Sequence, residues 1–235
     1  FILFLHKTVT LLNSWYLKCK PNILTMKRTI QVLAVIGLVV LAPEVVAQKQ
    51  KKVMKFQVSK VIDLPADQVW AVVGEDYGRI AYSHPKIMTS EYINGTLKAG
   101  EGAERICYFN EKETQYLKEK MINYSPEKMS FTNTVFQAGK FPVDPEYTKA
   151  IYRVKDLGNG KSEFSFDMQY RTKPAFMGSM AKGKFKRLIQ DYFIAVEHHA
   201  KTGEKVTKDN FKEIKKMYSK NESSNDMTAI ASAFN

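Results

Sequence analysis

The sequence predicts an α+β fold in which a curved, seven-stranded antiparallel sheet wraps around a long C-terminal helix. The order of the elements over residues 54–203 supports this prediction. A strand of alternating apolar and polar residues is followed by a short helical stretch, then by six further strands with short turns, and finally by one amphipathic helix. Such an order leaves room for a ligand between the sheet and the helix.

The first strand is predicted over residues 54–62, where apolar and polar side chains alternate. Two short helices should follow it. One begins over residues 63–67, with Pro65 near its first turn. The other covers residues 77–82 and ends before Pro85, because a proline disfavours helical backbone in the residue that precedes it.

Six more strands follow in close order. Their predicted ranges are 87–93, 104–109, 114–123, 129–136, 148–156 and 162–171. Asn94-Gly95 and Gly158-Asn159-Gly160 are typical turn sequences between strands. Because short connections join antiparallel neighbours, these strands should form a meander.

The apolar spacing becomes that of a helix from residue 175 to about residue 201. The side chains expected to face the sheet are Met177, Ala181, Phe185, Leu188, Tyr192, Val196 and His199. Gly203 is the expected C-terminal cap. Residues 210–220 predict a short basic helix, for which packing on the domain is preferred over contact with a membrane. The polar run after Asn221 is expected to be disordered.

The N-terminal part has the features of a secretory signal over residues 26–47. A basic start, an apolar run over residues 30–42 and small residues ending at Ala47 are its three parts. The run is short for a membrane span, and an N-terminal anchor is the alternative. Residues 1–25 are interpreted as untranslated upstream sequence or as a leader extension. We therefore expect a periplasmic or secreted protein that begins with Gln48.

The composition is that of an ordinary globular protein with a positive charge. The chain has 36 basic and 24 acidic residues, a net charge of +12. Without residues 1–47 the counts are 31 and 23, a net charge of +8, which permits weak contact with anionic membrane surfaces. Nucleic-acid binding is not expected, because the aromatic residues fall on inward faces. Cys107 would remain as a lone cysteine, and neither a metal site nor a cofactor is predicted.

Four short segments carry a family resemblance. They are Leu64-Pro65-Ala66-Asp67-Gln68-Val69-Trp70, His84-Pro85, Gly100-Glu101-Gly102-Ala103-Glu104-Arg105 and Glu119. In this order they resemble the START-like helix-grip superfamily, and within it the polyketide cyclase/dehydrase and lipid-transport branch, often labelled SRPBCC. The resemblance spans residues 54–203 and implies a helix-grip fold with a cavity for a hydrophobic small molecule. It implies no single activity, because the superfamily includes carriers, sensors and enzymes.

Strand alternation predicts which side chains face this cavity. If the hairpin turns around residues 111–113, Arg105 and Glu119 lie opposite each other and form an inward ion pair. Such a pair either fixes the strand register or recognises a polar ligand group. The predicted ligand-contacting residues are Arg105, Phe109, Leu117, Glu119, Phe131, Asn133, Tyr152, Phe166, Tyr170 and Phe185.

The preferred function is that of an exported, non-catalytic carrier of a hydrophobic small molecule or lipid. The alternative is a polyketide cyclase/dehydratase-like enzyme that uses polar residues of the same cavity. Glu119 and His84 are the titratable candidates for proton transfer. Neither has a clear partner in the sequence, so the carrier is preferred. The sequence predicts no oligomeric state.

Overall fold

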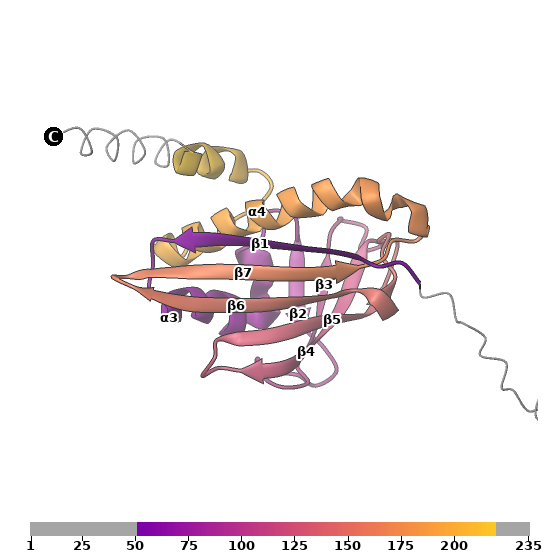
Figure 1. The fold of residues 1–235 in the computed structure, drawn as a ribbon, viewed down its shortest axis with the longest axis horizontal. Coiled ribbons are helices and arrows are strands. Elements are labelled where there is room, and N and C mark those ends of the chain that lie inside the picture. Colours follow the sequence, from indigo (N-terminus) through magenta and orange to yellow (C-terminus); the bar gives the residue numbers. More distant parts are fainter. Residues whose placement is uncertain (1–50, 220–235) are drawn as a thin grey trace, which may run out of the picture. The chain divides into compact units, whose positions relative to one another are not determined.

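The computed structural model describes residues 51–219. The predicted signal peptide over residues 26–47, the segment before it and the polar run after Asn221 lie outside the described residues. A seven-stranded antiparallel sheet and one long helix, α4 (Gly178–Thr202), form the described domain (Figure 1). Within residues 51–219, none of the helices combines the length and hydrophobicity needed to cross a bilayer.

The sheet is a meander whose first strand pairs with its last. Its spatial order is β1-β7-β6-β5-β4-β3-β2, and every pair is antiparallel. The strands are β1 (Met54–Ile62), β2 (Thr89–Tyr92), β3 (Glu104–Tyr108), β4 (Tyr116–Ser125), β5 (Ser130–Ala138), β6 (Lys149–Gly158) and β7 (Lys161–Tyr170). All seven predicted strands are present. The prediction for β2 was too long, because Ile87 lies in the loop that leads into the strand.

Three short helical segments fill the space between β1 and β2. They are α3 (Ala66–Trp70), the π-helical turn η1 (Ala71–Glu75) and the 3-10 helix η2 (Tyr77–Tyr82). The predicted first helix starts later than expected, at Ala66, with Pro65 as its cap residue. The buried rings of Trp70 and Tyr77 both pack against Phe131 of β5, so these segments close one end of the core.

The long helix α4 follows a 3-10 turn, η4 (Ala175–Met177), and ends at Gly203 as predicted. Gly203 has a φ of 72°, a left-handed conformation that glycine adopts without steric cost. The second half of α4 is buried, with Phe193 among its most enclosed residues. The predicted sheet-facing stripe was wrong at its start: Met177 lies in η4 and is 38% exposed, because this part of the chain extends beyond the filled core.

A short helix over residues 211–219 follows α4. Phe211, Ile214 and Val206 form a small apolar cluster with Ala195 of α4. The backbone N–H of Val206 also donates to the carbonyl oxygen of Tyr82 at 2.8 Å. Phe211 and Ile214 of this helix are therefore packed within the domain.

Candidate ligand pocket

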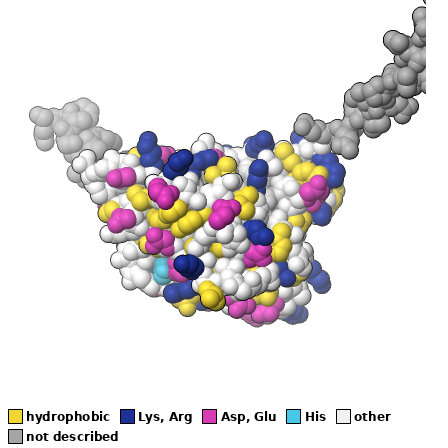
Figure 2. Space-filling model, turned by 90° about the horizontal axis from the view of Figure 1, so that it is seen from below, with side chains coloured by type: hydrophobic (Ala, Val, Ile, Leu, Met, Phe, Trp, Pro, Cys, Tyr) yellow, Lys and Arg dark blue, Asp and Glu magenta, His cyan; other side chains and the backbone are white. Residues whose placement is uncertain are grey.

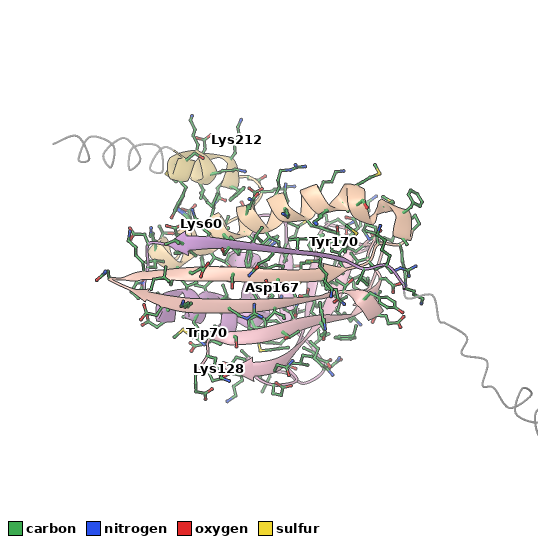
Figure 3. The ribbon with its side chains drawn as sticks, viewed as in Figure 1. Lys60, Trp70, Lys128, Asp167, Tyr170 and Lys212 are labelled. Atoms are coloured by element: carbon green, nitrogen blue, oxygen red, sulfur yellow. The ribbon has the colours of Figure 1, made fainter. Side chains whose placement is uncertain are left out.

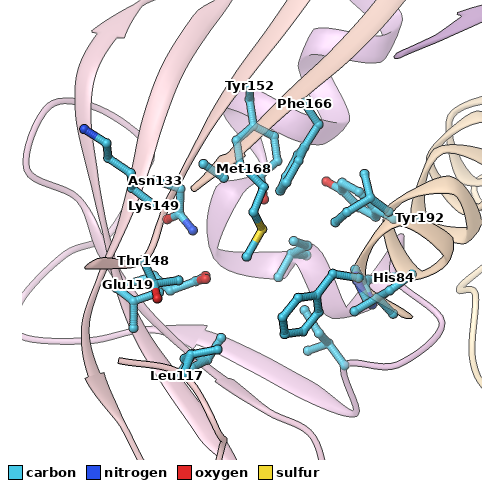
Figure 4. A pocket seen from close by; sticks show the side chains of 18 of the residues that line it. His84, Leu117, Glu119, Asn133, Thr148, Lys149, Tyr152, Phe166, Met168 and Tyr192 are labelled. Atoms are coloured by element: carbon cyan, nitrogen blue, oxygen red, sulfur yellow. The ribbon is translucent and has the colours of Figure 1, made fainter. Parts of the chain in front are cut away.

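A cavity of about 90 Å³ lies between the concave face of the sheet and the first half of α4 (Figure 4). Its walls come from η2, from strands β3 to β7, from α4 and from three connecting loops. Met168 of β7 reaches into the space between the sheet side chains and the rings of His84 and Tyr192. Most of the lining side chains are apolar, and only a few polar side chains project into the cavity.

Eight of the ten predicted ligand-contacting residues line this cavity. They are Arg105, Phe109, Leu117, Glu119, Asn133, Tyr152, Phe166 and Phe185. The other two also point to the concave side, but neighbouring side chains separate them from the space. Phe131 stacks on Tyr152 with 4.4 Å between ring centroids. The hydroxyl of Tyr170 donates to the carbonyl oxygen of Gly178 at 2.7 Å, so this hydroxyl already has a hydrogen-bond partner.

Several lining residues lie outside the predicted set of ten ligand-contacting residues. His84, which the sequence analysis names as a candidate for proton transfer, and Ile87 come from the loop before β2, while Phe141 and Val143 come from the β5–β6 connection. Loops have no alternating pattern, so nothing in their sequence indicates direction. The remaining lining residues outside that set lie on η2, on strands or at strand ends, and on α4, where Leu188 and Tyr192 belong to the predicted sheet-facing stripe. They are Ile80, Val135, Thr148, Lys149, Ala150, Met168, Leu188, Ile189 and Tyr192. The alternation of apolar and polar residues predicts that a side chain faces the concave side of the sheet. It does not predict whether that side chain lines a cavity or fills the core.

The polar end of the cavity is the predicted Arg105–Glu119 pair. Arg105 and Glu119 are direct partners in the β3–β4 register. Nε of Arg105 donates to Oε2 of Glu119 at 2.7 Å, and Nη1 donates to the carbonyl oxygen of Tyr77 at 2.7 Å. The guanidinium carbon also lies 3.9 Å from the centre of the Tyr77 ring. With exposures of 2% and 8%, the two charges depend on each other rather than on water.

Arg105 remains a cation in this setting. Burial by itself lowers its pKa, but the Glu119 carboxylate, together with smaller contributions from Tyr77, Cys107 and Tyr152, outweighs this effect and holds the pKa of Arg105 well above its ordinary value. Burial raises the pKa of the Cys107 thiol and of the Tyr152 hydroxyl, with the Arg105 charge opposing the rise in both. The thiol lies 3.6 Å from Oε2 of Glu119 and donates to it. Cys107 and Tyr152 are therefore neutral groups beside one ion pair.

His84 is a neutral side chain in the cavity wall. Burial, followed by the nearby Arg105 charge, lowers the pKa of His84 to about 3. Its Nδ1 accepts a hydrogen bond from the backbone N–H of Lys86 at 3.1 Å. The ring proton therefore belongs on Nε2. The imidazole also packs against the Tyr192 ring, with centroids 5.0 Å apart.

The cavity has the character of a small-molecule site but a small size. Ligand pockets are typically about 300–1,000 Å³, with apolar walls and few polar groups. A ligand larger than a few atoms therefore enters this cavity of about 90 Å³ only if side chains on its wall move. Met168 is suited to such movement, because methionine is unbranched and flexible. Within residues 51–219, no three potential metal-ligating side chains come together.

Solved structures share this architecture at low sequence identity. The ZhuI aromatase/cyclase from Streptomyces sp. R1128 is 14% identical, with a TM-score of 0.51 over 64% of this chain and 94% of that one. A protein from Thermobifida fusca is 17% identical, with a TM-score of 0.51 over 62% and 92%. Norcoclaurine synthase from Thalictrum flavum is 17% identical, with a TM-score of 0.46 over 66% and 90%. At these identities the first two likenesses establish the fold alone, and the third adds nothing to it.

No curated protein matches the chain. A family model does match it: the model described as polyketide cyclase/dehydrase and lipid transport covers residues 53–195, more than half of the chain. The match includes the sheet, the short helices and most of α4. The resemblance found in the four short segments is therefore confirmed over residues 53–195. The chain belongs to the polyketide cyclase/dehydrase and lipid transport family, with the START-like helix-grip fold.

Proposed function

We propose that this protein is an exported carrier that holds a hydrophobic small molecule or a lipid between its sheet and α4. The observation that carries the proposal is the cavity itself. Its walls are mainly aromatic and aliphatic, and its charged lining residues are the Arg105–Glu119 ion pair and Lys149, whose ammonium points away from the cavity in Figure 4. This arrangement suits a ligand that is apolar over most of its surface and has one polar group.

The rival function is a cyclase/dehydratase-like enzyme acting in the same cavity. General acid–base catalysis needs a group whose pKa lies near the working pH. The pKa of His84 is lowered to about 3, so it stays unprotonated at neutral pH and is a weak base. Burial raises the pKa of Tyr152, and Glu119 is held in the ion pair with Arg105. These properties favour a carrier over an enzyme.

A fluorescent probe tests occupancy of the cavity. N-phenyl-1-naphthylamine brightens when it enters an apolar site, and we expect saturable binding with about one site per chain. Ala150 is 5% exposed and lines the cavity, so Ala150→Leu projects a larger side chain into it. This variant should weaken binding about tenfold or more. Ser165→Leu is the matched control, because residue 165 alternates with the inward-facing Phe164 and Phe166 on the same sheet.

Equal binding by wild type and Ala150→Leu would show that the probe does not use the cavity and would contradict the proposal. Thermal unfolding of both variants shows whether the added side chain leaves the fold intact. The enzyme would be established instead by turnover that disappears in both Glu119→Gln and His84→Ala while probe binding remains.

A further inference from the structure

The turn η4 and the start of α4 expose large apolar side chains. Phe176 and Met180 are each 77% exposed, and Met177 between them is 38% exposed. Other exposed large apolar residues in the described part of the chain, such as Leu97, occur singly along the sequence. Single exposed apolar residues are normal on soluble proteins, whereas a cluster indicates a contact surface. Three within five residues form such a cluster.

The same segment is strongly basic. Residues 173–187 contain five basic residues and no acidic residue. Lys173 pairs with Asp144 at 3.2 Å. The other four, Lys182, Lys184, Lys186 and Arg187, form no ion pair with any residue in the range 51–219. By contrast, the face in Figure 2 carries acidic and basic side chains interspersed.

We propose that residues 173–187 are a docking surface for anionic lipid bilayers. Met180, Lys184 and Arg187 are spaced by four and three residues, so they lie on one face of α4. Phe176 and Met180 supply the apolar contact with the acyl chains, and the basic residues lie at the level of the lipid phosphates. Each cation near an anionic surface adds to binding, and neither the apolar nor the basic part suffices alone. The absence of acidic residues from the segment makes its charge complementary to such a bilayer.

The position of this surface connects it with the pocket. Phe185 and Leu188 lie on the same half of α4 and line the cavity from their side. A bilayer bound to the opposite, exposed side would therefore be separated from the cavity by this half-helix. Docking would bring the cavity close to the apolar phase from which a hydrophobic ligand is taken. The docking itself does not require the proposed carrier function.

The basic helix over residues 211–219 is a weaker candidate for this contact. Its apolar residues Phe211 and Ile214 are buried against Ala195 of α4. Of its large apolar side chains, only Met217 is strongly exposed, at 49%. Its lysines therefore lack the adjacent apolar residues that insertion requires.

Flotation with lipid vesicles tests the proposal on the full exported chain. We expect binding to vesicles of phosphatidylcholine with phosphatidylglycerol and little binding to phosphatidylcholine alone. Phe176→Ser combined with Met180→Ser should lower partitioning onto the anionic vesicles about tenfold or more. Lys184→Ala combined with Arg187→Ala should lower it about tenfold. Leu97→Ser is the control, because this leucine is 89% exposed and lies far along the chain; it should bind as the wild type does.

Three results would overturn the proposal. They are no binding of the wild type to anionic vesicles, an equal loss in Leu97→Ser, and normal vesicle binding by the Phe176/Met180 variant. If that last variant instead changes the oligomeric state, the cluster is a contact between copies of the chain. Because both residues are so exposed, the variant should bind N-phenyl-1-naphthylamine normally. Failure of docking and failure of the carrier function are therefore measured separately.

Discussion

Arg105 and Glu119 form a buried ion pair, and removing one partner should lower the stability of the fold more than replacing both. Glu119→Ala strands a buried cation, so we expect a loss of about 3 kcal/mol or more in the free energy of unfolding. Replacing both residues with leucine should cost less, because no uncompensated charge remains. Urea denaturation of the two variants measures the difference.

The neighbouring pair on the other face of the same hairpin is a matched control. Glu104 and Lys120 are also direct register partners, and their charged groups lie 2.6 Å apart. The Lys120 side chain is 43% exposed, so Glu104→Ala should cost no more than about 1 kcal/mol. If Glu119→Ala costs as little as Glu104→Ala, the inner pair does not have the buried character described here.

His84 makes the stability of the fold depend on pH. Its pKa is lowered from 6.5 to about 3, so the unfolded chain binds this proton more readily than the folded one. The stability that neutral His84 contributes is therefore complete above pH 6.5 and is lost as the pH falls toward 3. Relative to His84→Asn, the wild type should lose about 1.4 kcal/mol per pH unit between about pH 6 and pH 4. A stability difference that does not change with pH would contradict this account of His84.

At the level of elements, the register of β3 and β4 was predictable once their hairpin turn was placed around residues 111–113. That register by itself predicts that Arg105 and Glu119 face each other, and the two residues are direct partners in the sheet. The loop residues Ile87 and Phe141 were not predictable as cavity walls, because their direction depends on where distant strands end. Phe131 shows a second limit: the alternation was right, but packing of the Tyr152 ring decided that it fills the core.

The helix over residues 211–219 contributes to the stability of the domain through few side chains. Phe211 is 8% exposed within its cluster, so Phe211→Ala should lower the free energy of unfolding by about 2–4 kcal/mol. Lys212 is exposed and points away from the domain (Figure 3), so Lys212→Ala should change it by less than about 0.5 kcal/mol. Thermal or urea unfolding of the Phe211→Ala and Lys212→Ala variants compares the two changes in the free energy of unfolding. Equal, small effects would mean that this helix does not pack on α4.

At the scale of the whole molecule, the proposed function depends on export. The predicted signal over residues 26–47 should be removed, and mass spectrometry of protein from the native host should find Gln48 at the mature N-terminus. Recovery of an uncleaved chain from the cytoplasm would contradict the localisation. It would leave the cavity and its ion pair unaffected, because both lie within residues 77–192.

The central claim is that the domain carries an apolar molecule without changing it. Native mass spectrometry of protein purified from its host without added detergent tests this claim most directly. We predict a bound apolar molecule, at up to one per chain, that organic solvent releases chemically unchanged and that is depleted in Ala150→Leu. Release of a product that differs from the molecule supplied, with turnover lost in Glu119→Gln and His84→Ala, would contradict the claim and establish an enzyme.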